Sequence, residues 1–131
     1  MKPLRYLFPL LFAVLAAPAV ADTVAGSAGD ITFAADAEAG LLAIKALGSV
    51  NGQALACAET TPAARAKELM LAHAPKTQRF GAAYEEATQE AFLAQTRAAG
   101  TCPAAAILTD RLNRLALQLA DTLPVLAPAA K

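Results

Sequence analysis

GSVNGQALAC, residues 48–57, is the stretch from which the fold is best deduced. It places Gly48 and Gly52 one helical turn apart inside a segment with helical periodicity, and it ends on a cysteine. Each glycine costs about 1 kcal/mol of helix propensity relative to alanine, so tertiary packing must offset that cost. In a bundle, the pair predicts a shallow groove where a neighbouring helix approaches closely. A kink or break at Asn51-Gly52 is the alternative.

The residues on both sides of this stretch predict an all-α domain, a small up-down bundle of about four helices. The chain is rich in alanine, and no window alternates apolar and polar residues with period two. The first helix is expected to begin between Asp30 and Asp36 and to run to about Glu59. It is apolar on most sides, as a helix surrounded by others is. The remaining helices are predicted at residues 62–74, 77–99 and 103–122.

The connections between these helices carry recognisable start and stop residues. Thr61 stands directly before Pro62 and Thr101 two residues before Pro103, and both threonines are predicted to cap the helices that follow. Gly100 is predicted to end the third helix in a left-handed conformation. Because the loops are short, we expect consecutive helices to be antiparallel neighbours.

Helical spacing also identifies the faces that should pack. The fourth helix has leucines at steps of four, three and four, which predicts a packing seam: Leu108, Leu112, Leu115 and Leu119. The third helix has an apolar stripe, widened by the last two of these residues: Phe80, Tyr84, Ala87, Ala91, Phe92 and Leu93. Its three glutamates, Glu85, Glu86 and Glu90, are expected to face solvent.

The N-terminus has the organisation of a secretory signal peptide. A basic MKPLR segment precedes an apolar run of about a dozen residues and an A-x-A site at Ala19-Val20-Ala21. The run is shorter than the ~20 residues that a membrane-spanning helix needs, so cleavage rather than anchoring is expected. Four parts are therefore predicted: a cleaved signal peptide at 1–21, a flexible N-terminus at 22–29, a single helical domain at 30–123 and a frayed Pro/Ala tail at 124–131.

Export determines how the two cysteines should behave. In an oxidising compartment, Cys57 and Cys102 are expected to form one structural disulfide, because no other pairing exists within the chain. Such a crosslink, closing a loop of about 45 residues, contributes roughly 4 kcal/mol in the chain-entropy model. The C-x-x-C spacing of redox-active cysteines is absent.

Composition excludes several classes of function. Without Lys2 and Arg5, the predicted mature chain has 9 basic and 11 acidic residues, a net charge of −2, which argues against nucleic acid or an anionic membrane as partner. Neither Ser27 nor Ser49 lies in a nucleophile motif, and no phosphate-binding glycine motif occurs. We expect a protein that is not an enzyme and has no cofactor.

Two functions from different classes remain. The first is an exported, periplasmic or secreted protein that acts by protein–protein interaction with another envelope or secreted protein, as a chaperone, inhibitor or immunity-type binder, either alone or as a homodimer. The alternative is a helical bundle that binds a small ligand or copper. The weak metal candidates are Met70 and His73, which are three apart and therefore share a helix face. A core methionine and a histidine at a helix end are the simpler interpretation of that pair.

Overall fold

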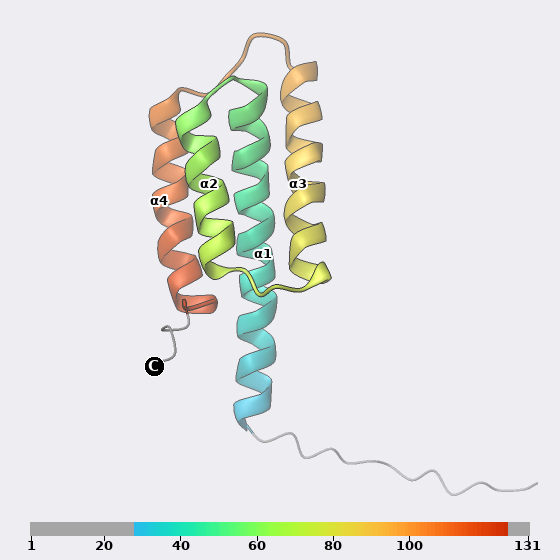
Figure 1. The fold of residues 1–131 in the computed structure, drawn as a ribbon, viewed down its shortest axis with the longest axis vertical. Coiled ribbons are helices and arrows are strands. Elements are labelled where there is room, and N and C mark those ends of the chain that lie inside the picture. The colour runs from blue at the N-terminus through green and yellow to red at the C-terminus, as the bar shows by residue number, and fades with distance from the viewer. Residues whose placement is uncertain (1–27, 126–131) are drawn as a thin grey trace, which may run out of the picture.

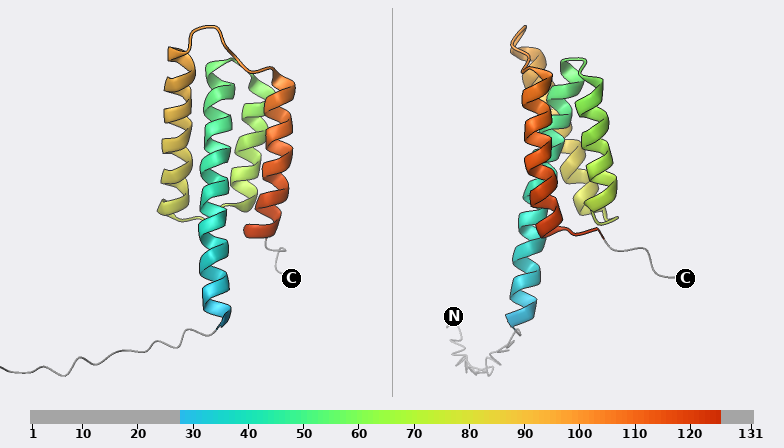
Figure 2. Two further views of the ribbon diagram at one scale, coloured as in Figure 1. Left: turned by 180° about the vertical axis from the view of Figure 1, so that it is seen from behind. Right: turned by 90° about the vertical axis from the view of Figure 1, so that its left-hand side faces the viewer.

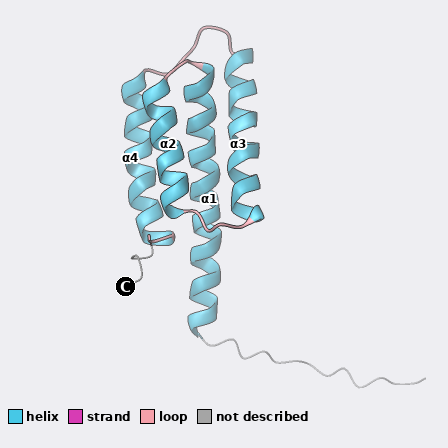
Figure 3. Ribbon diagram, in the orientation of Figure 1, coloured by secondary structure: helices cyan, strands magenta, loops and turns pink. Residues whose placement is uncertain are grey.

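The chain is an all-α bundle of four helices over the residues that the structure describes. The computed structural model describes residues 28–125 of the 131, with side chains from residue 34 onward. Figure 3 shows helices joined by loops, without a strand in that range. The fold-class prediction is confirmed, whereas the predicted signal peptide and residues 22–27 and 126–131 lie outside the described range. The helices are α1 (Ala28–Ala56), α2 (Thr60–His73), α3 (Gln78–Arg97) and α4 (Ala105–Thr122).

Helix α1 lies at the centre of the bundle and packs against all three other helices. The chain direction alternates from one helix to the next, so α1 and α3 run parallel to each other (Figure 1). The first turns of α1 project beyond the other helices (Figures 1 and 2). The prediction that the first helix is central is therefore confirmed.

Helix α3 departs from the expected arrangement. It packs extensively against α1 alone, while α2 and α4 pack against α1 and against each other. The expectation that consecutive helices are neighbours holds for α1 and α2 but is wrong for both connections of α3. The 98–104 connection spans the end of the bundle from α3 to α4, which allows α3 to remain on the far side of α1 (Figure 1).

The hydrophobic core lies mainly between α1, α2 and α4, and Phe80 and Ala83 of α3 also belong to it. The leucine seam of α4 is confirmed, since all four of its leucines are buried. Burying one such side chain fully contributes roughly 2 kcal/mol, so this seam is a major source of stability. The largest fully buried side chains are Ile44, Leu47, Leu108, Leu112 and Leu119.

The end of α1 differs from its prediction. The helix stops at Ala56 instead of continuing to Glu59, because Ala58 adopts a left-handed conformation with φ of 57°. The amide of Glu59 then donates a hydrogen bond back to the Ala54 carbonyl at 2.8 Å. This is the pattern that terminates many helices, here with alanine where glycine is usual. At its other end α1 begins at Ala28, before the predicted start.

The predicted threonine caps are wrong at both sites. Helix α2 begins at Thr60 after Glu59, and α4 begins at Ala105 after Ala104, without a side-chain capping bond in either case. The Thr101 hydroxyl instead donates to the Ala98 carbonyl at 3.0 Å, which closes the end of α3. Gly100 has φ of +88°, as predicted for a left-handed residue after that helix.

Candidate functional site

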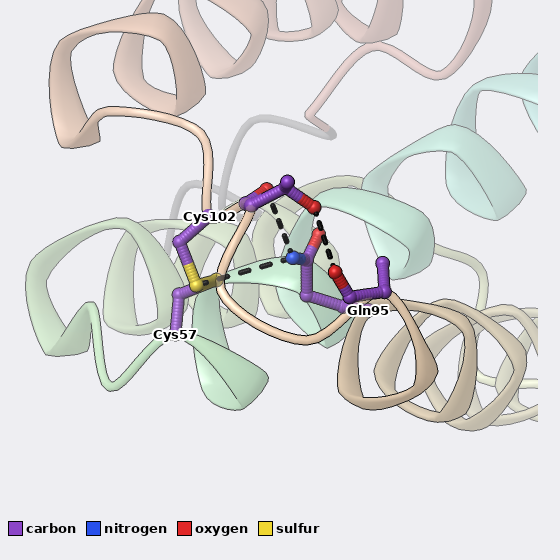
Figure 4. The surroundings of a disulfide bond; sticks show 5 residues. Cys57, Gln95 and Cys102 are labelled. Atoms are coloured by element: carbon purple, nitrogen blue, oxygen red, sulfur yellow. Dashed lines mark hydrogen bonds between the residues drawn. A yellow bond between two sulfur atoms is a disulfide. The ribbon is translucent and has the colours of Figure 1, made fainter.

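The disulfide predicted from the cysteine count is present. Cys57 and Cys102 are bonded, with their Cα atoms 5.7 Å apart, and the described residues include no free cysteine. The bond joins the α1–α2 turn to the connection between α3 and α4. The Gln95 amide donates to the Thr101 carbonyl at 3.1 Å and lies 3.9 Å from the Cys102 sulfur (Figure 4). The crosslink thus holds together the end of the bundle at which α1 and α3 end and α2 and α4 begin.

The two glycines of the opening stretch face α3. A Cβ atom built on Gly48 would lie 2.5 Å from the Tyr84 carbonyl oxygen and 3.0 Å from the Ala87 Cβ. A Cβ atom built on Gly52 would lie 2.8 Å from the Phe92 nitrogen and nearer still to the Thr88 carbonyl oxygen. Separations this short exclude any side chain. Each glycine therefore permits the backbone of α3 to approach that of α1.

Besides the exposed ion pair between Arg79 of α3 and Glu38 of α1, a buried polar bond crosses the interface between these helices. The buried Asn51 amide donates to the Thr88 hydroxyl at 3.3 Å. Asn51 remains helical, so the kink that was the alternative at Asn51-Gly52 does not occur. The glycines, this bond and the small Ala87 and Ala91 of α3 form what we call the glycine seam.

Close packing of α3 on α1, without packing of α3 on α2, leaves an open groove between α2 and α3. It consists of two adjoining hollows of about 380 and 320 Å³ that share Leu55 and Tyr84. We call this surface the α2–α3 groove. Its floor on α1 is Asn51 and Leu55; its α2 wall is Ala63, Ala64 and Lys67; its α3 wall is Tyr84, Glu85, Thr88, Gln89 and Phe92.

Apolar side chains are exposed in the α2–α3 groove. Leu55 is 51% exposed and Phe92 is 39% exposed, although both belong to faces that the sequence assigns to packing. The Tyr84 hydroxyl is buried and has no hydrogen-bond partner among the described residues. Burial raises the pKa of Tyr84 from 10.0 to about 12, because the phenolate would lose its hydration. This surface is suited to an apolar ligand.

The two walls of the groove carry opposite charges. Lys67 on α2 and Glu85 on α3 are both exposed, and neither forms an ion pair within the described range. Glu85 was expected to face solvent, and it does so at the rim of the groove.

The structure does not bring Met70 and His73 to a common hollow. Met70 packs against the core and lines one hollow, whereas His73 lines another beside the end of α4. The His73 Nδ1 atom lies 2.8 Å from the Leu123 carbonyl, to which it donates a hydrogen bond when it carries the proton. Residues 34–125 contain no group of three or more metal-ligating His, Cys, Asp or Glu side chains.

A separate hollow, between α1 and α4, is more polar than the α2–α3 groove. It has a volume of about 520 Å³ and includes Arg111 and Arg114. Each arginine already has a partner: Arg111 donates to the Gln53 side-chain oxygen Oε1 at 2.9 Å, and Arg114 lies 3.5 Å from the Asp110 carboxylate. Arg114 is therefore paired with an anion, whereas Arg111 bonds a neutral amide.

Sequence reasoning missed the α2–α3 groove, because Leu55 and Phe92 lie beside residues that do pack. Periodicity placed them on packing faces but did not indicate which faces would be covered. No helix in the described range is long and apolar enough to cross a bilayer.

No family model matches the chain, and searches of curated proteins and of solved structures found no significant match. Function is therefore inferred from the geometry of the described residues.

Proposed function

We propose that this chain is an exported protein that acts by binding another envelope or secreted protein, as a chaperone, inhibitor or immunity-type binder, through the α2–α3 groove. The observation that carries the proposal is the exposure of Leu55 and Phe92 in an elongated groove between two helices that do not pack together. Exposed apolar surface in a small folded domain marks an interaction site when it is contiguous.

The shape of the groove favours a protein segment as the ligand. The groove runs along the bundle between two helices and has α1 as its floor, which is the arrangement in which an amphipathic helix or extended apolar segment docks. Export is supported by the signal-peptide pattern of residues 1–21 and by the disulfide, since structural disulfides persist in oxidising compartments.

Site-specific photo-crosslinking in cells of the natural host tests this function. A photoreactive amino acid replaces Gln89 on the wall of the groove, and in a matched control it replaces Leu117, which is 72% exposed on α4 outside the groove. We expect one reproducible adduct with a different protein from position 89 and none from position 117. Absence of such an adduct from position 89, or equal labelling from both positions, would contradict the proposal.

A further inference from the structure

The α2–α3 groove has one basic wall and one acidic wall, which makes it complementary to itself. We propose that a second copy of this chain covers the groove, in a two-fold symmetric dimer in which α2 of each copy faces α3 of the other. The inference rests on the proposed function in so far as both use the same groove. The inference adds that, in the absence of a protein partner, the groove is covered by a second copy of the chain.

The charged residues of the two walls lie at similar heights along the groove. Lys67 and Glu85 line the two hollows that share Tyr84. Lys67 is six residues before the end of α2 at His73, and Glu85 is seven residues after the start of α3 at Gln78. These helix ends are joined by one short connection at the same end of the bundle (Figure 1). At a rise of 1.5 Å per residue, both residues lie about 10 Å from that end.

The apolar and small residues of the groove lie farther from the α2–α3 connection than the charges do. Leu55 lines both hollows, with Phe92 in one of them and with Ala63 and Ala64 in the other. By the same rise of 1.5 Å per residue, Phe92, which is 14 residues after Gln78, lies about 21 Å from that end of the bundle. Ala63 and Ala64, ten and nine residues before His73, lie about 14–15 Å from it. All three are closer to the disulfide end than the charges are.

A two-fold axis parallel to the groove keeps each height and exchanges the walls. Lys67 of each copy then faces the partner's Glu85, and Phe92 of each copy packs against the first turn of the partner's α2, about one helical turn beyond Ala63 and Ala64. An isologous interface forms every contact twice, so the charge pair and the apolar contact are both doubled. An axis across the groove would instead place each α2 against the other α2 and bring like charges together, which disfavours it.

Covering Leu55 and Phe92 supplies a reason for the dimer and connects it to function. The two side chains are exposed in the single copy and lie near the axis in the pair. A protein partner that binds the groove competes with the second copy, so the dimer is the resting state of the binding surface.

Charge reversal tests the pairing with purified, oxidised mature protein. We expect sedimentation equilibrium to give twice the mass of one chain, and the dimer Kd to rise with salt as the paired charges are screened. Lys67→Glu and Glu85→Lys each create two like-charge contacts and should raise Kd about tenfold or more. The double variant restores both pairs and should dimerise again. Glu90→Lys, which changes net charge on α3 outside the groove, should leave Kd unchanged.

Mixing the two single variants is the most selective measurement. Across a two-fold interface, Lys67→Glu in one copy meets Glu85→Lys in the other while the unchanged Glu85 and Lys67 meet each other, so an equimolar mixture should form a heterodimer although each variant alone does not. A monomeric wild type, or a mixture that stays monomeric, would overturn the inference. A monomer that still forms the heterologous adduct from position 89 would overturn only the dimer. A dimer without that adduct would overturn only the proposed function.

Discussion

The two sides of α1 are packed by opposite means. On the α4 side, four leucines bury large side chains in a continuous core. On the α3 side, glycines and alanines bring two backbones together, and carbonyl oxygens of α3 point at the glycine positions of α1. The leucine seam depends on the area buried, and it tolerates small shifts. The glycine seam depends on the absence of side chains at Gly48 and Gly52, so a substitution that adds a side chain at either position is enough to disrupt it.

The disulfide joins the end of α1 to the connection between α3 and α4, and its loss should have the largest effect on stability. We expect Cys57→Ser combined with Cys102→Ser to lower the free energy of unfolding by about 4 kcal/mol, because the crosslink limits the unfolded chain across a separation of 45 residues. Urea unfolding of the variant and of oxidised wild type measures the difference. Equal midpoints and equal slopes would show that the bond constrains neither seam.

Leu112→Ala should weaken the leucine seam. The side chain is 1% exposed, and its truncation removes buried area and leaves a cavity, for an expected loss of about 3 kcal/mol. Thermal unfolding should remain a single transition, because α4 packs against both α1 and α2. Leu117→Ala on the exposed face of the same helix is the control, with a change of less than about 0.5 kcal/mol expected.

Gly52→Leu should break the glycine seam by overpacking, at a cost of about 2–3 kcal/mol. The new side chain would overlap the backbone of α3, and α3 has no other extensive packing to hold it in place. Hydrogen exchange should therefore accelerate in α3 more than in α4. Uniform acceleration across all four helices would mean that the two seams unfold as one unit.

Gly81→Ala is the matched control for that substitution, because Gly81 lies in α3 with no atom within 4 Å of the Cβ position. We expect it to stabilise the protein by about 0.5–1 kcal/mol through helix propensity alone. A loss of stability in Gly81→Ala would show that other protein atoms occupy the space beside Gly81 in solution.

The smallest effect at neutral pH concerns the hydroxyl of Tyr84 beside the glycine seam, because this effect appears only in alkaline solution. Its pKa is about 12 in the folded protein and 10.0 in the unfolded chain, so the protonated form is favoured by folding. The associated stability is complete below pH 10 and is lost as pH rises from about 10 to about 12. Tyr84→Phe removes the ionisation, and its Tm should fall less than that of wild type between pH 9 and pH 11.5. If the Tm of the two proteins falls equally with pH, the Tyr84 hydroxyl is hydrated in the folded protein.

Much of this arrangement follows from local pattern. The number of helices, the leucine seam and the left-handed Gly100 could be predicted because each depends on residues within one or two turns. The disulfide could be predicted because two cysteines permit one intrachain pair. The caps at Thr61 and Thr101 were wrong because several residues in each connection can start a helix, and packing selects among them.

The sequence by itself determined that these residues form helices, which face of α4 is buried, and that a helix comes close to α1 at Gly48 and Gly52. Only the tertiary structure decided that this helix is α3, and that α3 lies apart from α2 and α4. The reason is physical: periodicity reports the faces of a single helix, whereas a groove is the space between two helices that do not touch. The exposure of Leu55 and Phe92 is a property of that pair of helices, and so is the opposition of Lys67 and Glu85 across it.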